Sequence, residues 1–259
     1  MKRGALIPVF VFIFSCRQDH EMGNLKILKE IPVNPLLTEY SENNNPIYSF
    51  SYDSGRLVSH TQFAVDGNIE FNYEYDSSGK PNKIEVSRPS YNYTIYPEFS
   101  DSLLRELSIM ADGRLQSRYV FENDSSGKMI KASRISPANV LIASAVFTWH
   151  GLNVTSYELK LLYVNPPITF RYDYEYDRLM NPYKVVFRDF KFNLIDFMPV
   201  SENNYIHMTG YNEDNPRSKV LISYQYSYSA GFPFFRYESL TDFNGATSNS
   251  YSDYNYVNQ

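Results

Sequence analysis

Aromatic residues recur at every second position in short runs, and each run ends in turn-forming residues. Tyr48, Phe50 and Tyr52 alternate with serines, and this run stops at Asp53-Ser54. Successive side chains of a β-strand point to opposite faces, so each run gathers its rings on one face of a sheet. The pattern returns in five further runs: Phe71, Tyr73 and Tyr75; Tyr119 and Phe121; Tyr172, Tyr174 and Tyr176; Tyr224, Tyr226 and Tyr228; Tyr254 and Tyr256. The alternation predicts a chain made mainly of strands that share one aromatic face.

The turns between these runs indicate how the strands connect. Gly55, Gly67 and Gly79 lie 12 residues apart. Glycine accepts the positive φ that tight turns need, and a preceding Asp accepts hydrogen bonds from the turn backbone. Asp112-Gly113 is a further hairpin dipeptide of this kind. Such regular, short spacing predicts successive antiparallel strands, each paired with its neighbour in the sequence.

The aromatic face needs a cover. The chain contains 24 Tyr and 18 Phe, and a sheet with one such face must bury it against another layer. We predict an all-β domain, an antiparallel β-meander of many short hairpins that curls on itself into a half-barrel or spiral roll. Phe187, Phe190 and Leu194 keep a helical spacing instead, which favours one short helix near residues 187–197.

The strand-and-turn unit resembles a known repeat. Residues 52–57, Tyr-Asp-Ser-Gly-Arg-Leu, resemble the YD repeat of the RHS family, and residues 75–80 and 121–128 resemble it with one added residue each. With the later Tyr-Glu-Tyr-Asp at residues 174–177, the chain is similar to uncharacterised Bacteroidota lipoproteins built from such strands. The resemblance implies a curved β-sheet over about residues 46–240. It implies no activity, because the repeats are too few for the toxin-enclosing shell of large RHS proteins.

The first fifteen residues have the features of a secretion signal. Lys2 and Arg3 give a positive start, and residues 4–14 form an uncharged, mostly apolar run. A membrane-spanning helix needs about 20 apolar residues, whereas a signal peptide needs an apolar core of about 7–15. We therefore predict a signal peptide over residues 1–15.

The segment Ile13-Phe14-Ser15-Cys16 resembles the bacterial lipobox. The resemblance implies lipidation of the Cys16 sulfur and signal cleavage between Ser15 and Cys16. Cys16 is the only cysteine of the chain, so it has no partner for an intramolecular disulfide. Two or more acyl chains hold a protein on a membrane durably, at about 0.8 kcal/mol per buried CH₂. We expect the membrane to be a partner of the protein through this anchor.

The residues after the cysteine bear on location and domain boundaries. Asp19 and Glu21 follow it, and a short acidic tract there resembles the surface-export signal of Bacteroidota-type lipoproteins. The expected location is the outer membrane, lipid-anchored, with display on the cell surface. We interpret residues 16–46 as the lipidated cysteine and a tether, with one edge strand over residues 25–33. Residues 47–259 form a single YD-repeat-like β domain.

The sequence contains no catalytic signature. Asp53-Ser54-Gly55 and the Ser-x-x-Lys segments at residues 77–80 and 125–128 fall in predicted turns, so we assign no catalytic residue. The four histidines stand far apart and no second cysteine accompanies them, so we predict no metal site and no cofactor. The formal net charge of −5 gives no electrostatic footprint for nucleic acid.

These features favour a membrane-anchored cell-envelope protein that acts as a non-catalytic β-scaffold for binding or adhesion. The partner is then a glycan or an envelope protein. The alternative is a carbohydrate-binding surface lipoprotein in which the single tryptophan, Trp149, stacks on a sugar ring. A hydrolase is the third possibility, because two carboxylates brought together only by the fold leave no sequence motif.

Overall fold

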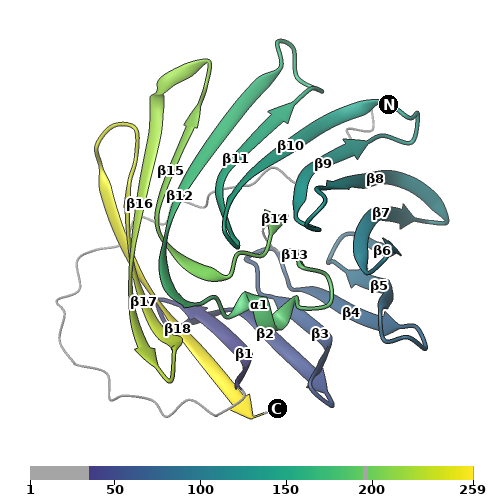
Figure 1. Ribbon diagram of the computed structural model, residues 1–259, viewed down its shortest axis with the longest axis horizontal. Coiled ribbons are helices and arrows are strands. Elements are labelled where there is room, and N and C mark those ends of the chain that lie inside the picture. Colours follow the sequence, from purple (N-terminus) through teal and green to yellow (C-terminus); the bar gives the residue numbers. More distant parts are fainter. Residues whose placement is uncertain (1–34, 195–197, 259) are drawn as a thin grey trace.

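The computed structural model describes residues 35–194 and 198–258, and these residues form eighteen strands and one short helix. Sixteen of the strands close into one barrel, in which each strand runs antiparallel to its neighbours (Figure 1). The other two strands, β13 and β14, pair with each other. The predicted edge strand at residues 25–33 lies outside the described residues.

The elements have the following bounds: β1 (Pro35–Glu42), β2 (Asn45–Asp53), β3 (Arg56–Gln62), β4 (Ile69–Tyr75), β5 (Pro81–Ser87), β6 (Asn92–Ser100), β7 (Leu103–Ala111), β8 (Arg114–Asn123), β9 (Met129–Ile135), β10 (Leu141–His150), β11 (Asn153–Leu161), β12 (Ile168–Met180), α1 (Tyr183–Val186), β13 (Phe192–Asn193), β14 (Met198–Pro199), β15 (Asn203–Asn212), β16 (Asn215–Ser229), β17 (Phe232–Thr241) and β18 (Thr247–Asn258). Around the barrel, β1 to β12 follow chain order, β15 lies beside β12, and β16 to β18 complete the ring. The all-β antiparallel meander is therefore confirmed.

The closure of the sheet corrects the predicted half-barrel or spiral roll. β1 pairs with both β2 and β18, so Tyr40 lies opposite Tyr48 on one side and Tyr254 on the other. The Tyr40 hydroxyl is hydrogen-bonded to the Ser252 hydroxyl at 3.0 Å, across 212 residues of sequence. An open roll would leave two edge strands with unpaired backbone N–H and C=O groups, and closure removes both edges. No local pattern marks a joint between segments so distant in sequence.

The barrel also begins earlier than the predicted domain boundary at residue 47. β1 lies within the segment that we interpreted as a tether, and its Leu37 and Tyr40 are buried. The register against β18 shifts between Leu37 and Glu39. This bulge interrupts the period-two alternation, which is why the aromatic pattern did not reveal the strand.

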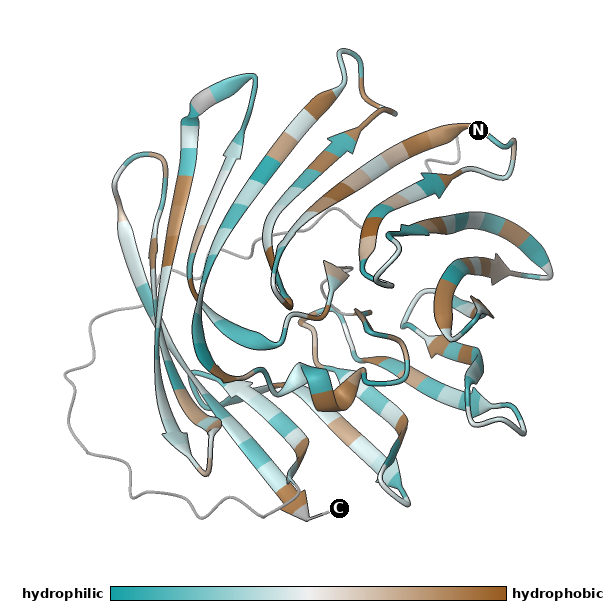
Figure 2. Ribbon diagram, viewed as in Figure 1, coloured by the Kyte–Doolittle hydropathy of each residue, from teal (hydrophilic) through white to brown (hydrophobic). Residues whose placement is uncertain are grey.

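Alternation separates the side chains into an inner and an outer wall. Along β4, Phe71 and Tyr73 are buried, whereas Glu70, Asn72 and Glu74 are exposed. Figure 2 shows hydrophobic and hydrophilic residues alternating along many of the strands. The predicted aromatic face is thus the inside of the barrel, and the polar face is the outside.

The connection between β12 and β15 runs inside the barrel and fills one end of it. We call this connection, residues 181–194 and 198–202, the plug; its elements α1, β13 and β14 lie within the ring of strands in Figure 1. Phe187 and Phe192 are fully buried, and the Phe192 ring packs on Phe121 of β8 with centroids 5.0 Å apart. A sixteen-stranded barrel is wide enough to hold an aqueous channel, so the plug supplies core that the wall itself lacks.

The plug contains the one helix of the described residues, but not where the sequence predicted it. We expected a helix near residues 187–197, whereas α1 covers only Tyr183–Val186. The chain leaves the helix at Phe187, and Lys191 takes a positive φ of 53°. The apolar residues of this segment are buried on several sides inside the barrel. Their spacing in the sequence imitates helical periodicity without forming a helix.

The two ends of the barrel differ because the plug sits at one of them. The Arg188 guanidinium of the plug donates to the Gly55 carbonyl at 2.8 Å, and the Glu202 N–H donates to the Leu152 carbonyl at 3.1 Å. The β2–β3 and β10–β11 turns therefore lie at the plug end. Because antiparallel strands alternate in direction, every second turn lies there, and the other turns surround the opposite end, which we call the mouth.

The Ser-x-x-Lys segments are turns, as the sequence predicted. The Asp124 carboxylate accepts hydrogen bonds from the backbone N–H groups of Ser126 and Lys128 at 2.8 and 3.0 Å. Asp76 makes the same pair of contacts in the β4–β5 turn. The two sequence copies therefore encode one turn geometry at the plug end.

Gly127→Ala should lower the free energy of unfolding by about 1–2 kcal/mol, because an L-residue resists a left-handed backbone. Gly127 has φ +82°, and an added Cβ would lie 3.3 Å from the Leu103 Cδ2 atom. Urea denaturation measures the change. Ser125→Ala is the matched control, because Ser125 belongs to the same turn without a positive φ; it should change stability by less than about 0.5 kcal/mol. Equal losses in the two variants would contradict the explanation.

Candidate functional site

The outer wall of the barrel carries ion pairs between charged side chains of its strands. Lys83 of β5 contacts Glu74 of β4 at 2.8 Å and Glu85 of its own strand at 2.7 Å. Lys131 of β9 contacts Glu122 of β8 at 2.6 Å. In a lipid-facing strand a lysine costs about 2–4 kcal/mol at the bilayer midplane and about 0–1 kcal/mol near the interfaces. In the described part of the chain, no helix is long and apolar enough to cross a membrane.

The inner wall holds a buried ionic cluster on β17, β18 and β1. The alternation of β17 brings Arg236 and Glu238 to the inside, where their side chains meet at 3.1 Å. Arg236 also donates to the hydroxyls of Tyr40, at 2.5 Å, and Ser252, at 3.3 Å. Its guanidinium carbon lies 4.8 Å from the centroid of the Tyr224 ring. The buried cation therefore has a carboxylate, two hydroxyls and an aromatic face around it.

Burial and charge act in opposite directions on this cluster. Burial raises the pKa of Glu238, and the neighbouring Arg236 opposes that rise. Burial likewise raises the pKa of Tyr40, again opposed by Arg236. The phenol stays neutral and donates or accepts hydrogen bonds, while Arg236 and Glu238 compensate each other. We interpret this cluster as part of the joint that closes the barrel.

Two more arginines face inward in the mouth half of the barrel. Arg88 follows β5; its guanidinium lies 5.5 Å from the Tyr93 ring and donates to the Tyr93 hydroxyl at 3.4 Å. Arg134 of β9 lies opposite Tyr119 of β8, with its guanidinium 5.6 Å from that ring. The Nε atoms of both arginines are buried and have no hydrogen-bond partner among the described residues. Buried polar atoms of this kind call for a physical explanation.

Stacked tyrosines continue the same surface toward β12. Tyr157 and Tyr172 lie opposite each other in the register of β11 and β12, with ring centroids 5.5 Å apart and planes 19° from parallel. Their hydroxyls make no hydrogen bond to any residue that the structure describes. Burial raises the pKa of both phenols, so they remain neutral donors. We call the six residues of this surface the arginine–tyrosine wall: Arg88, Tyr93, Tyr119, Arg134, Tyr157 and Tyr172.

Solvent reaches the arginine–tyrosine wall but not the inner wall beside the plug. All six of its residues are partly exposed. At the plug level, by contrast, Phe50 and Phe121 of the same inner wall are buried. A molecule that enters the mouth therefore meets arginine and tyrosine side chains before it meets the plug.

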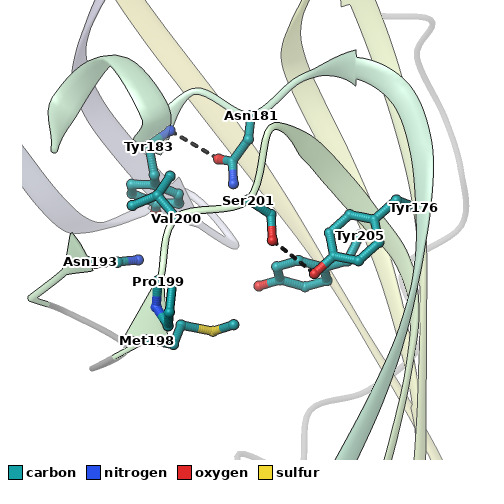
Figure 3. Close-up of a pocket in the computed structure, with 9 residues that line it drawn as sticks. All are labelled: Tyr176, Asn181, Tyr183, Asn193, Met198, Pro199, Val200, Ser201 and Tyr205. Carbon is teal, nitrogen blue, oxygen red and sulfur yellow. Dashed lines mark hydrogen bonds between the residues drawn. The ribbon is translucent and has the colours of Figure 1, made fainter. Parts of the chain in front are cut away.

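A small pocket lies between the plug and the barrel (Figure 3). It measures about 20 Å³, room for about one water molecule. Tyr176 of β12 is hydrogen-bonded to Ser201 of the plug at 3.0 Å, and the Tyr183 N–H donates to the Asn181 side chain at 3.0 Å. Among the described residues, its lining contains no carboxylate. The pocket is a polar seam between the plug and β12.

The residues that the sequence singled out fall in different places. Ser15 and Cys16 lie outside the described residues, so cleavage and lipidation stay predictions. The Trp149 indole N–H donates to the Met129 carbonyl at 2.8 Å, and its ring packs against the core cluster. Its stacking on a ligand stays a prediction. Within residues 35–194 and 198–258, no group of three or more His, Cys, Asp and Glu side chains could hold a metal ion.

The functional features that the sequence analysis missed are the inward-facing arginines. Arg88, Arg134 and Arg236 occupy positions that the alternation assigns to the aromatic side. A charged residue at the aromatic position of a strand was the signal that could have identified them.

Comparison with known proteins supports the fold and little more. No family model and no curated protein matches the sequence, so the likeness to the YD repeat stays a prediction. Among solved structures, the chain is similar to a porin-like protein from Bacteroides uniformis ATCC 8492, with 11% identity and a TM-score of 0.57. The match covers 85% of this chain and 96% of that protein. A likeness at this identity shows a shared all-β barrel architecture and transfers no activity.

Proposed function

We propose that this chain is a lipid-anchored envelope protein whose barrel stands in water and serves as a non-catalytic binding scaffold. The observation that carries the proposal is the set of ion pairs on the outer wall, which includes Arg118 with Glu106 at the middle of β8 and β7 and Lys83 with Glu85 within β5. A barrel that crossed the membrane would present apolar side chains there. Because this wall is polar, attachment to the outer membrane falls to Cys16 and its acyl chains.

The position of the first described strand orients the barrel relative to that anchor. β1 starts at Pro35 at the plug end, where the Tyr52 hydroxyl, next to the β2–β3 turn, donates to the Leu37 carbonyl at 2.7 Å. Eighteen residues separate Cys16 from Pro35, and a chain of that length spans at most about 60 Å. The anchoring segment therefore joins the barrel at the plug end, and the mouth lies at the end opposite this attachment, where a binding partner can enter.

Cys16→Ser should move the protein from the membrane fraction to the soluble fraction. The polar outer wall cannot hold the barrel in lipid once the acyl chains are absent. Fractionation followed by an alkaline wash of the membranes measures the distribution. Ser15→Ala is the matched control, because it keeps a small residue before the cysteine and should stay membrane-bound. A Cys16→Ser protein that resists the wash would show that the barrel itself spans the membrane.

Carbohydrate binding is the second candidate, and the partly exposed tyrosines of the mouth favour it. Tyrosine combines an apolar ring with a hydroxyl, which suits a sugar ring and its hydroxyl groups. Glycan binding that disappears with Trp149→Ala would assign the contact to that residue. Hydrolysis of a glycosidic bond requires two convergent carboxyl groups, and the described residues that line the pocket in Figure 3 include none.

A further inference from the structure

We infer that the arginine–tyrosine wall binds a polyanionic oligosaccharide, a chain of sugars that carry carboxylate or sulfate groups, which enters the barrel through the mouth. The inference rests on the proposed function, because it places the ligand inside a barrel that is open to water. It names the ligand class and the residues of the site, which the proposed function leaves open.

The wall carries cations with no matching anions. Arg236, elsewhere on the inner wall, has Glu238 at 3.1 Å. Arg88 and Arg134 lie against tyrosine rings instead, and neither has an ion pair with a described residue. A partly buried charge is costly unless a counter-charge or hydrogen bonds compensate it. Carboxylate and sulfate groups match the fork geometry of a guanidinium and form strong, charge-assisted hydrogen bonds with it.

The tyrosines add donors of the same kind. The Tyr157 and Tyr172 hydroxyls point from the inner wall and have no hydrogen-bond partner in the described chain. As neutral phenols they donate to anionic oxygens and to sugar hydroxyls. On β10, Phe147 lies opposite Tyr157 and stacks on it, whereas the residues at and next to the position opposite Arg134 are Ala143 and Ala145. These small side chains leave the ligand room to approach the wall.

The spacing of the two arginines favours a chain over a single small anion. Arg88 follows β5 and Arg134 lies on β9, four strand intervals away around the barrel. Neighbouring strands lie about 4.8 Å apart, so the two positions are separated by up to about 19 Å along the wall. One sulfate or one uronic acid reaches only one of them. An oligosaccharide with an anion on successive sugars reaches both and continues to the tyrosines of β11 and β12.

The charge of the rest of the molecule makes this surface selective. The whole chain has a formal net charge of −5, so its outside does not attract polyanions in general. Arg88 and Arg134 are partly exposed and have no ion pair with a described residue, whereas the Glu238 carboxylate of the inner wall is held by Arg236. This arrangement disfavours a nucleic-acid duplex, which needs a broad basic surface.

The experiment is isothermal titration calorimetry of the mature lipoprotein, purified in a non-ionic detergent, with oligogalacturonate and with heparin-derived oligosaccharides. At least one of them should bind, and added salt should weaken the binding. Arg88→Gln and Arg134→Gln should each reduce the affinity at least tenfold. Monomeric galacturonate and inorganic sulfate should bind at least a hundredfold more weakly than the oligomer.

Matched variants separate the site from general electrostatics and from misfolding. Arg118→Gln is the control, because Arg118 is an outer-wall arginine paired with Glu106 at 3.5 Å. The Arg118→Gln variant should bind the oligosaccharide with the affinity of the unmodified protein. Tyr172→Phe keeps the ring and loses only the hydroxyl, so it should fold normally and bind several-fold more weakly. Thermal unfolding checks each variant.

Three outcomes would overturn the inference: no binding of either oligosaccharide, equal binding of poly-glutamate or neutral dextran, or an Arg118→Gln loss as large as that of Arg134→Gln. Each of these results is independent of membrane fractionation. A barrel that fails to bind oligosaccharide but is released by Cys16→Ser refutes the ligand and keeps the proposed anchoring. A barrel that binds oligosaccharide but stays in the membrane without Cys16 refutes the anchoring and keeps the ligand.

Discussion

Phe187→Ala is expected to lower the free energy of unfolding by about 3–5 kcal/mol, the range for a large aromatic residue removed from a core. Phe187 lies in the plug and is fully buried. Its ring meets His60 of the barrel edge-on, with centroids 6.2 Å apart. The loss is large because nothing can collapse into the space: the barrel wall is held by its strand pairing, and the plug is attached at both ends. Chemical denaturation followed by circular dichroism measures the change.

Phe243→Ala is the control for this variant. Phe243 is also an aromatic residue outside the strands, but it lies in the β17–β18 turn and is 60% exposed. Removal of the Phe243 ring should change the free energy of unfolding by less than about 0.5 kcal/mol. If Phe187→Ala costs under about 1 kcal/mol, the plug is an independently mobile insert and not part of the core. Amide exchange would then show the plug opening separately from the barrel.

The strand pattern was predictable because it depends on neighbouring residues alone. The alternation of Tyr48, Phe50 and Tyr52 reflects one strand, and the turn at Ser54-Gly55 reflects a local need for positive φ, 50° and 77° in the structure. Strand pairing with the next strand follows from such turns without further information. The inward direction of the rings follows as well, because a polar face and an aromatic face can curl only one way in water.

Closure and the plug were not predictable from the same pattern. Whether a meander stays open or closes depends on its two end strands, and β1 is disguised by its bulge between Leu37 and Glu39. The plug depends on barrel width, which is a property of all sixteen strands together. The helical spacing of Phe187, Phe190 and Leu194 predicted a helix in the wrong place, since the observed helix ends at Val186. These three residues are apolar because they lie inside a barrel that is formed by the rest of the chain.

The candidate site illustrates the same limit. Arg134 in the sequence is one charged residue in a strand, and its position opposite Tyr119 depends on the β8–β9 register. Its relation to Arg88 depends on the curvature of five strands. Composition therefore indicated a scaffold, while the ligand surface emerged only when the strands were placed around the barrel.

A second large effect is expected from His60, a histidine in the aromatic core. The side chain is 2% exposed, and its ring is stacked on Phe71 with centroids 4.0 Å apart. The Nδ1 atom is hydrogen-bonded to the Tyr73 hydroxyl at 2.8 Å, whereas the Nε2 atom is buried and has no partner among the described residues. Burial lowers the pKa of His60 from 6.5 to about 3. The folded barrel therefore holds this imidazole neutral.

The barrel should lose stability as the pH falls below 6.5. The unfolded chain protonates His60 below pH 6.5, whereas the folded chain does so only near pH 3, so the unfolded state binds the extra proton between these values. The contribution of neutral His60 to the free energy of unfolding is complete above pH 6.5 and is lost progressively toward pH 3. At about 1.4 kcal/mol per pH unit, the loss is on the order of 2 kcal/mol at pH 5 relative to pH 8. Urea denaturation at pH 8, 7, 6 and 5 measures it.

The double variant His60→Phe/Tyr73→Phe should remove this dependence. Both partners of the buried hydrogen bond are replaced by rings of similar shape, so no unpaired hydroxyl remains in the core. Its unfolding free energy should stay nearly constant from pH 8 to pH 5 and exceed that of the unmodified protein at pH 5. His207→Gln, at an exposed histidine on β15, should retain the original pH dependence. Stability that is flat from pH 8 to pH 5 in the unmodified protein would mean that water reaches His60 and that the aromatic core is not dry. A slope that persists in the double variant would assign the pH dependence to groups other than His60.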